Sequence, residues 1–434
     1  MAEPRTYTSE LLDAHLASAI EPLSAELQAK VDGAGWPEGL IERVLNLRRD
    51  REEVEMWIDT GFPTVEMLDS WMDMQELLIH STLHNREATW EDHGLLVELC
   101  AEAPEKVGEW TVTVERGPYP YAQFRLQEHP SVTILEDRRI PLGMAARSVR
   151  NTYIGGERLT AHFMSGWRIR EGFRGLGLSN MLQFSPGPGV GWFGVVTYWF
   201  VRIGNSSSSW ISKIEDDLAD RGDFSLETDT LTATVTNFDD PAAGSRSTNV
   251  REATAADLPR CVELINRSHA GLDLFRPYTL EYLEERLDDP SWGPKPSFYA
   301  SVYGWPDFRV VERDGEVVAC GGLWDRGRDV RDVWRRGEET HVEDPAALLD
   351  FGLAEGHDAA LAELISHFLA DTSELGRSGL LVSLDFQPKL RAALDELSLS
   401  SRPEIRELHV MPFAMPDFEL EVVIERPYID LAYW

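Results

Sequence analysis

The chain has 434 residues, more than one ordinary domain holds, and its hydrophobic fraction of 43% is enough to fill real cores. Its 41 Lys and Arg residues face 75 Asp and Glu residues, which gives a formal net charge of -34. A surface this acidic repels phosphate groups, so neither nucleic acid nor an anionic membrane is expected as a partner.

Cysteine usage and hydropathy indicate where the protein resides. Cys100, Cys261 and Cys320 lie far apart and form no CxxC pair, which favours buried thiols over a disulfide scaffold or a structural zinc site. The N-terminus has no signal-like apolar core, and the longest apolar stretch is too short to span a bilayer. We therefore expect a soluble, cytoplasmic protein of two or three compact units that needs no metal.

The first 82 residues carry apolar side chains at helical spacing. Leu12, Leu16 and Leu23 fall on one helical face, residues 40–47 form another such face, and a third helix is expected over residues 64–79. The pattern predicts a helical extension over residues 1–82.

An internal repeat divides the rest of the chain. The run from Arg86 to Asp92, REATWED, recurs from Arg251 to Asp257 as REATAAD, and VEL at residues 97–99 recurs at residues 262–264. Eight of fourteen positions are therefore identical at one shift of 165 residues. In both copies Thr is predicted to cap a helix that has an acid in its first turn. The repeat predicts two homologous domains, over residues 83–245 and 246–434, with a linker at residues 239–245.

Within the first of these domains, strands alternate with a helix. Residues 132–135, 142–153 and 159–169 are predicted strands, and Gly155-Gly156 forms a tight turn between the last two. A glycine-rich loop, a helix over about residues 176–184 and a very apolar strand over residues 192–203 follow. This order of elements is typical of an α/β domain.

The glycine-rich loop, Arg174-Gly175-Leu176-Gly177-Leu178-Ser179, has the features of an anion site. It opens a predicted helix, so its N–H groups point outward as free donors, and its glycines let a phosphate approach the main chain. Arg174 adds a positive charge in an otherwise acidic chain. The GK[ST] of a Walker loop and the spacing of a dinucleotide fingerprint are both missing, and the pattern favours a pyrophosphate ligand.

The segment from Trp167 to Ser179 resembles the acyl-CoA signature of the GNAT acyltransferase superfamily. In that signature a strand and a turn lead to Arg/Gln-x-x-Gly-x-Gly/Ala at the start of a helix. Arg174 and Gly177 fit it, Ser179 stands at its final position, and Glu171 replaces a proline often found before the loop. The resemblance implies an α/β fold with two tandem GNAT-like domains, each a mixed twisted sheet flanked by helices, after the N-terminal helical extension.

The resemblance also implies a mechanism. The strands on either side of the loop would part, and the pantetheine arm of acetyl-CoA or another acyl-CoA would lie between them, bonded to backbone amides near Trp167 and Ile169. An amine would attack the thioester carbonyl directly, so proximity supplies most of the catalysis and no covalent enzyme intermediate forms. The family's second motif, an Asn that precedes a helix, is matched by Asn205. The residues expected to bind the cosubstrate are Trp167, Ile169, Arg174, Gly175, Leu176, Gly177, Leu178, Ser179 and Asn205.

The general base and acid are not fixed by the sequence. Similar enzymes often carry a Glu on the strand before the loop and a Tyr near the leaving thiolate, and Ser165 and Ser212 occupy these two places here. Neither hydroxyl is a good base or acid near pH 7 without help. The other nearby candidates are His162, Tyr198, Tyr153 and Glu157.

The sequence of the second domain has the pattern of a degenerate copy of the first domain. A hairpin is predicted around Asp314-Gly315, between residues 308–311 and 316–320. Where the phosphate loop should follow, residues 354–360 lack the arginine and the paired glycines and carry two acids that repel pyrophosphate. This domain is expected to bind no CoA and to shape either the acceptor cleft or the interface of a homo-oligomer.

Three functions are compatible with these patterns. The first is an N-acyltransferase that moves an acetyl or other acyl group from acyl-CoA to a small-molecule amine. The alternative is a non-catalytic acyl-CoA-binding or regulatory protein, because the usual Glu and Tyr are absent. In the third, the chain is a scaffold in which neither loop binds CoA.

Overall fold

The computed structural model describes the following residues: 29, 33, 83–102, 104–117, 124, 126–128, 130–137, 140–170, 182, 196–203, 229–288, 303–383, 391, 399–412 and 424–434. Apart from two positions, the predicted helical extension lies outside this set. The glycine-rich loop at residues 174–179 also lies outside the described residues, as do Asn205 and Ser212.

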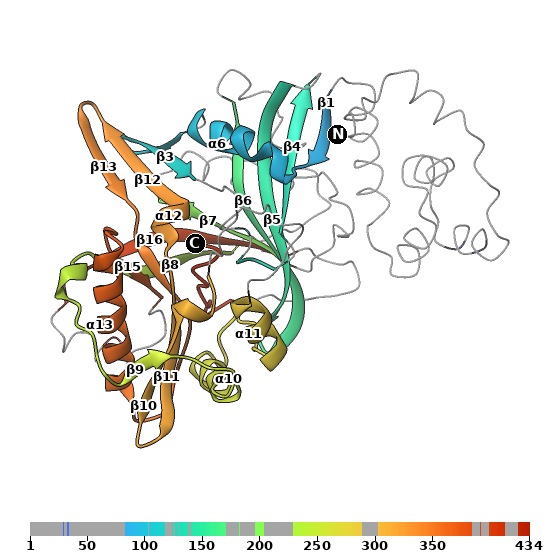
Figure 1. Ribbon diagram of the computed structural model, residues 1–434. Coiled ribbons are helices and arrows are strands. Elements are labelled where there is room, and N and C mark those ends of the chain that lie inside the picture. Colours follow the sequence, from blue (N-terminus) through green and yellow to red (C-terminus); the bar gives the residue numbers. More distant parts are fainter. Residues whose placement is uncertain are drawn as a thin grey trace.

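Among the described residues, twelve strands form one mixed sheet (Figure 1). The strands of its first half are, in spatial order, β1 (Leu83–Glu87), β4 (Ser131–Asp137), β5 (Ile140–Ile154), β6 (Glu157–Ile169), β7 (Val196–Arg202) and β16 (Ser401–Pro412). The second half continues with β8 (Asp229–Phe238), β15 (Leu380–Val382), β14 (Ala346–Leu353), β11 (Glu316–Trp324), β10 (Phe308–Arg313) and β9 (Val250–Glu252).

The two halves of the sheet exchange their last strands. β8 follows the first half in sequence but pairs with β15 of the second half, and β16 from the end of the chain pairs with β7. β16 and β8 also pair with each other, antiparallel, from Ser401↔Phe238 to Val410↔Asp229. The halves are therefore joined at the centre of the sheet by main-chain hydrogen bonds. These pairings do not test the predicted division at residue 245, which stays a prediction.

A smaller sheet also links the halves. Its strands lie in the order β13 (Glu339–Glu343), β12 (Val330–Arg336), β3 (Trp110–Arg116) and β2 (Glu105–Val107). β12 comes from the second half and β3 from the first, and they pair antiparallel from Val330↔Arg116 to Arg335↔Thr111. No sequence pattern predicted this sheet, which brings charged residues of both halves to the end of β7.

Helices cover both faces of the large sheet. α6 (His93–Glu102) lies over the first half, with Leu96 and Leu99 fully buried. α10 (Leu258–Ser268) and α13 (Asp358–Glu374) lie on opposite sides of the second half, and α11 (Leu280–Leu287) follows α10 (Figure 1). The short helices are η1 (Trp90–Asp92), η3 (Pro241–Ala243), η4 (Trp305–Asp307) and α12 (Arg326–Asp329). Within the described part of the chain, every helix is too short or too polar to cross a bilayer.

The internal repeat makes the same contacts in both halves. The guanidinium of Arg86 donates to both carboxylate oxygens of Asp92 at 2.7 and 2.6 Å, and Arg251 donates to Asp257 at 2.8 and 2.9 Å. In each copy Thr donates its backbone N–H to that carboxylate, at 2.7 Å for Thr89 and 2.8 Å for Thr254. The predicted Thr cap is corrected here, because Asp257 and not Thr254 is the N-cap residue of α10. The acid instead closes the turn that leads into the helix.

Both predicted hairpins form. β5 and β6 meet at Gly155-Gly156, whose φ angles of 58° and 86° fit a tight two-residue turn. β10 and β11 meet in the same way at Asp314-Gly315, with φ angles of 51° and 82°.

Candidate functional site

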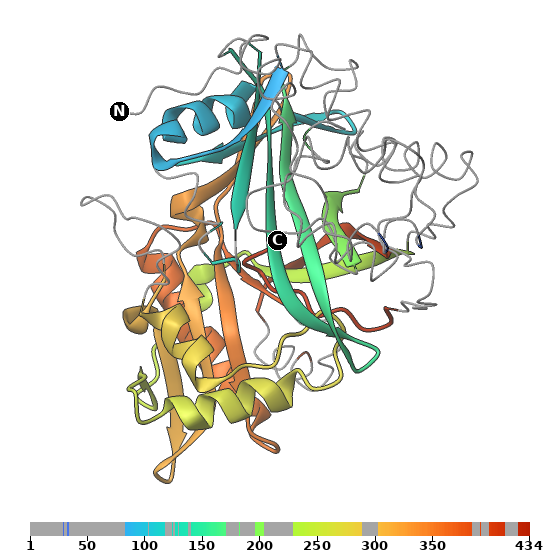
Figure 2. The same ribbon diagram turned by 90° about the vertical axis from the view of Figure 1, so that its right-hand side faces the viewer.

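The strands β6 and β7 part from one another. They run parallel and pair only at Ala161↔Val196, His162↔Thr197 and Phe163↔Tyr198. β6 then continues to Ile169 along β5, while β7 continues to Arg202 along β16. Figure 2 shows the long β5–β6 hairpin running steeply across the strands at the centre of the sheet. We call the opening between residues 164–169 and residues 199–202 the fork.

A β-bulge lies in β6 at the side of the fork. Ala146 of β5 pairs with Ser165 and Met144 pairs with Arg168, so two residues of β6 face one residue of β5. Gly166 lies in the bulge with a φ of +62°, a conformation that costs other L-residues about 1–2 kcal/mol. The extra residue turns the following stretch of β6 and changes which backbone groups face the fork.

Backbone directions follow from one hydrogen bond at the end of β6. The Arg170 N–H donates to the Leu142 carbonyl of β5 at 2.9 Å. Since N–H groups alternate between the two edges of a strand, those of Ile169 and Trp167 are directed away from β5, towards the fork. These are the two residues whose amides the sequence analysis expects to hold a pantetheine arm.

Aromatic rings line one face of the fork. Trp167 of β6 and Trp199 of β7 lie with their ring centroids 6.4 Å apart. Trp199 also stacks on His409 of β16, with a centroid distance of 5.7 Å and an interplanar angle of 8°. The two indole rings are inclined at 47° to each other and form a largely apolar wall.

A buried ion-pair network spans the other face of the fork. Glu105 of β2 accepts hydrogen bonds from Arg168 of β6 at 2.8 Å and from Arg202 of β7 at 2.9 Å. Arg202 also donates to Asp332 of β12 at 2.5 Å. Burial alone would raise the pKa of Glu105, but the two guanidinium groups outweigh it and the pKa lies below its ordinary value. Glu105 thus fixes the ends of two parting strands with one carboxylate.

The narrow end of the fork is covered by the last residues of the chain. Tyr433 packs edge-on against Phe163, with ring centroids 5.0 Å apart, and Trp434 packs against Phe200 at 5.4 Å. The Tyr433 hydroxyl oxygen also accepts a hydrogen bond from the backbone N–H of Glu128 at 3.1 Å. Sequence reasoning missed Tyr433 and Glu105, because each reaches the fork from a distant segment without a motif of its own.

The structure separates the candidate acids and bases. His162 and Tyr198 lie at the narrow end of the fork, but on opposite faces of the sheet, because Tyr198 is aligned with Phe163, the next residue along β6. Ser165 lies beside the bulge, and its hydroxyl has no hydrogen-bond partner among the described residues. Ser212 lies outside the described residues.

Burial controls the protonation of two of these candidates. Burial, with a smaller contribution from Arg147, lowers the pKa of His162 to about 4, so the imidazole is neutral at pH 7. Burial also raises the pKa of Tyr198 far above its ordinary value, which keeps the phenol protonated. Among the described residues, neither the Tyr198 hydroxyl nor the His162 Nε2 has a hydrogen-bond partner.

The second half contains a corresponding fork that is closed. β14 and β15 pair only at Ala346↔Leu380 and Ala347↔Leu381, and β14 has a bulge of its own. Asp350 occupies the place of Gly166 in this bulge, with a φ of 52°. It accepts hydrogen bonds from the hydroxyls of Tyr278 at 2.6 Å and Tyr303 at 2.9 Å.

Side chains at the end of α10 form hydrogen bonds with the backbone groups that face this second fork. The Leu353 N–H donates to the Ser268 hydroxyl at 2.9 Å, and His269 Nε2 lies 3.0 Å from the Phe351 carbonyl oxygen. Leu353 and Phe351 hold the places that Ile169 and Trp167 hold in the first half, by the matching ladder registers. Of the residues predicted as a degenerate phosphate loop, 354–357 lie between β14 and α13, and 358–360 form the first turn of α13.

No protein-family model and no curated protein sequence matches the chain. Among solved structures, Saccharomyces cerevisiae N-myristoyltransferase with bound myristoyl-CoA covers 76% of this chain and 83% of its own, at 10% identity and a TM-score of 0.50. A second structure of that enzyme, with bound myristoyl-CoA and inhibitors, covers 80% and 84%, at 10% identity and a TM-score of 0.49. A conserved protein of unknown function from Enterococcus faecalis covers 76% and 72%, at 11% identity and a TM-score of 0.39. The first likeness shows that the chain has the tandem GNAT fold.

Proposed function

We propose that this protein is an N-acyltransferase that moves an acyl group from acyl-CoA to an amine by direct attack. The fork carries this proposal, because it combines two parting parallel strands with a bulge that aims the Ile169 and Trp167 N–H groups into the opening. The bound myristoyl-CoA in the yeast enzyme of similar fold supports an acyl-CoA as the donor.

The residues of the fork fit a pantetheine arm. An extended chain that carries two amide groups needs backbone donors at strand spacing and an apolar wall, and Trp167 and Trp199 supply that wall. The loop at residues 174–179 and Asn205 would hold the diphosphate end. The cosubstrate supplies an activated thioester carbonyl, and the protein orients it and excludes water.

The leaving thiolate is proposed to be stabilised mainly by Tyr198. Its phenol stays protonated at pH 7 because burial raises its pKa, and it lies at the narrow end of the fork, so it can donate a hydrogen bond to a leaving thiolate. His162 is neutral but a weak base, since its pKa is about 4. The amine is therefore proposed to lose its proton to Ser165, Ser212 or a water chain.

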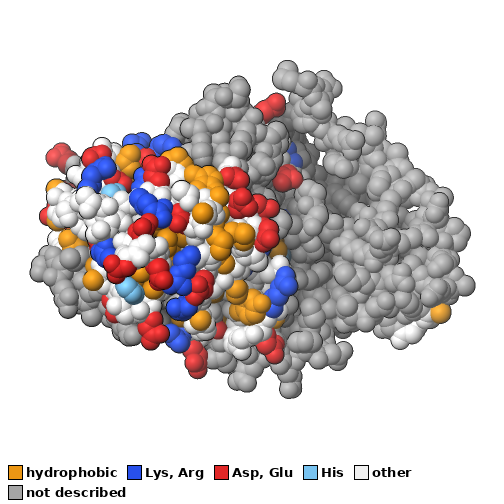
Figure 3. All heavy atoms as spheres, turned by 60° about the horizontal axis from the view of Figure 1, so that its bottom comes forward, with side chains coloured by type: hydrophobic (Ala, Val, Ile, Leu, Met, Phe, Trp, Pro, Cys, Tyr) orange, Lys and Arg blue, Asp and Glu red, His pale blue; other side chains and the backbone are white. Residues whose placement is uncertain are grey.

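The acceptor is proposed to be a small-molecule amine. The acidic composition alone does not identify it, because charged groups of both signs are interspersed with apolar side chains on the face shown in Figure 3. Acceptor choice then depends on the groups that surround the fork.

A non-catalytic acyl-CoA-binding protein is the second candidate. One observation favours it: the carboxylate that spans the fork, Glu105, is held by Arg168 and Arg202 and is not available as a base. A thiol-release assay with acetyl-CoA and a panel of amines separates the two functions. An enzyme releases CoA thiol in proportion to added amine, and Tyr198→Phe slows this release without weakening acetyl-CoA binding. If acetyl-CoA binds and no amine in the panel increases thiol release, the binding protein is the correct function.

A further inference from the structure

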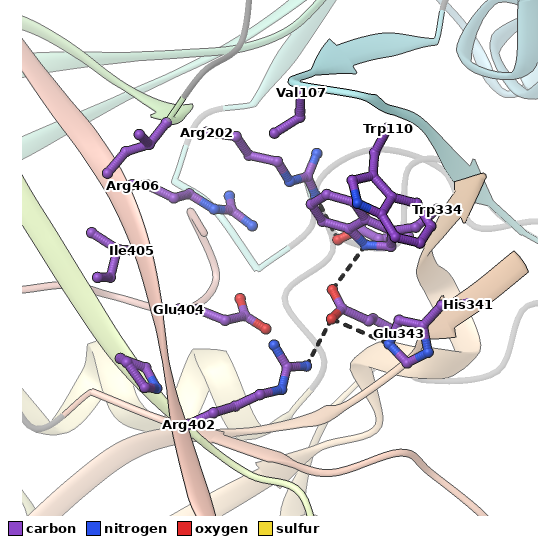
Figure 4. A pocket seen from close by; sticks show the side chains of 13 residues that line it. Val107, Trp110, Arg202, Trp334, His341, Glu343, Arg402, Glu404, Ile405 and Arg406 are labelled. Carbon is purple, nitrogen blue, oxygen red and sulfur yellow. Dashed lines mark hydrogen bonds and ion pairs between the residues drawn. The ribbon is translucent and has the colours of Figure 1, made fainter. Parts of the chain in front are cut away.

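A cavity of about 390 Å³ opens beside the end of β7, between β16, the β12–β13 hairpin and the β2–β3 turn. Figure 4 shows the side chains of Arg202, Arg402, Arg406 and Glu404 directed into one shared space, with Trp110 and Trp334 at its side. None of the residues predicted to bind acyl-CoA lines it. We call it the Arg406 cavity.

Most charged groups of this cavity are already paired. Glu343 accepts from Arg402 at 2.7 Å and from the indole N–H of Trp334 at 2.9 Å. Arg202 is held by Asp332, and Glu404 accepts from the indole N–H of Trp434 at 3.1 Å. Each carboxylate of the cavity therefore accepts at least one hydrogen bond from within the protein, although the Asp332 Oδ1 has no hydrogen-bond partner among the described residues.

Arg406 is the exception. Its guanidinium stacks over the Trp434 ring at 4.2 Å, but it donates no hydrogen bond to a described residue and has no described carboxylate within 4.0 Å. Burial, and then the neighbouring guanidinium of Arg202, lowers the pKa of Arg406 to about 10, although the charges of Glu404 and Asp332 act in the opposite direction. The group is therefore still charged at pH 7. A half-buried cation with five N–H donors next to a second cation is costly unless an anion joins it.

The chemistry of the cavity defines the ligand class. A planar guanidinium binds carboxylate and phosphate oxygens in pairs. Trp110 and Trp334, which meet edge to face with centroids 6.3 Å apart, offer an apolar surface beside it. We propose that the Arg406 cavity binds one small organic oxyanion, a carboxylate or a phosphate, whose oxygens contact Arg406 and whose apolar body lies against these two indoles.

Glu404 limits this site to a single oxyanion. It lies two residues from Arg406 on the same strand and face, so a second anionic group would meet its carboxylate. The inference goes beyond the proposed acyl transfer and does not rest on it, because binding can be measured with no acyl-CoA present.

The test is calorimetry on the full chain with three probes of similar size: benzoate, phenyl phosphate and the neutral benzyl alcohol. We expect one or both anions to bind with one site per chain and benzyl alcohol to bind at least about tenfold more weakly. The anion that binds with the higher affinity shows whether the site prefers a carboxylate or a phosphate. If neither anion binds at concentrations up to about 10 mM, the proposal is wrong.

Substitutions assign the binding to this cavity. Arg406→Met should weaken anion binding about tenfold or more, and Arg406→Lys should weaken it less, since a single ammonium keeps the charge but not the paired donors. Arg331→Met is the matched control, because Arg331 is exposed, pairs with Glu115 and does not line the cavity. Equal affinity in Arg406→Met and the wild type would overturn the proposal.

Two further variants keep the test decisive. Glu404→Gln should strengthen anion binding a few-fold by removing a nearby negative charge, and this result carries the test if Arg406→Met does not fold. Unchanged affinity in Glu404→Gln would then count against the proposal. Arg174→Glu should leave probe binding unchanged. Loss of probe binding in this variant would show that the anion binds at the glycine-rich loop, and it would refute the assignment to the Arg406 cavity.

Discussion

Phe163 of β6 and Tyr198 of β7 are the last aligned pair of a parallel ladder that is only three pairs long. Both strands continue beyond this pair, each along a different partner. In such an opening, main-chain groups of both strands are directed towards the space between the strands and not into the ladder. The proposed function depends on this opening.

The bulge beside the opening gives the first prediction. In Gly166→Ala the new Cβ meets only ordinary contacts, the nearest being the Cβ of Ala146 at 3.5 Å, but the residue keeps a φ of +62°. We expect a loss of about 1–2 kcal/mol in the free energy of unfolding, measured by urea denaturation, and weaker acetyl-CoA binding. Gly94→Ala in α6, where the added Cβ meets open space, should raise stability slightly instead. A Gly166→Ala protein with unchanged stability and affinity would show that the bulge is not required.

The carboxylate that spans the fork gives the second prediction. Glu105→Gln leaves Arg168 and Arg202 buried without their shared anion, so unfolding should become easier by about 3 kcal/mol at pH 7. Because the folded-state pKa of Glu105 is lowered, its contribution is present above pH 4.5 and is lost as the pH falls below that value. The difference in the free energy of unfolding between wild type and variant should therefore become smaller at acidic pH.

The control for this experiment is Glu339→Gln, which removes an exposed partner of Arg336. Exposed pairs of this kind contribute about 0–1 kcal/mol, so its unfolding curve should stay close to that of the wild type. If both variants lose the same free energy of unfolding, the Glu105 network does not stabilise the fork.

A buried histidine gives the third prediction. His162 has a folded-state pKa of about 4 against an ordinary value of 6.5, so between these values the unfolded chain binds a proton that the folded chain does not. The contribution of this neutral imidazole to the free energy of unfolding should be fully present above pH 6.5. It should fall towards pH 4 by about 1.4 kcal/mol per pH unit. His162→Gln should have a shallower slope over this window. A matching slope in the variant would mean that the imidazole is solvated, and the exposed His341→Gln serves as the reference.

The closed second fork gives the fourth prediction. Ser268 and His269 already contact the backbone groups of β14 that face this fork. We therefore expect calorimetry to show one acetyl-CoA per chain, and Ser268→Ala to leave the affinity unchanged while lowering stability by about 1 kcal/mol. Two equivalents per chain would contradict the closure.

Local features of the fold were predictable from sequence. The turns at Gly155-Gly156 and Asp314-Gly315 are signalled by residue type alone, and both hairpins form. The repeat was also visible, and Arg86 and Arg251 make matching contacts because their acidic partners recur at the same spacing. The GNAT-like organisation followed from these patterns together with the resemblance.

The exchange of β8 and β16 could not be predicted. Strand periodicity shows which face of a strand is buried, but it does not tell which strand lies beside it when the partner is about 170 residues away. The parts of the site that depend on such contacts were missed for the same reason. Glu105 belongs to a strand of three residues, and only the folded chain brings it between Arg168 and Arg202.

The central claim is that acyl-CoA binds at the fork and at the loop that follows β6. Calorimetric titration of acetyl-CoA into the wild type and into Arg174→Glu combined with Gly177→Asp tests it most directly. The second half supplies the control, Gly356→Asp, in the loop before α13. We expect the double variant to fold and to lose acetyl-CoA binding, because a carboxylate at each position repels the diphosphate, while Gly356→Asp binds like the wild type. Equal affinity in the double variant and the wild type would contradict the account.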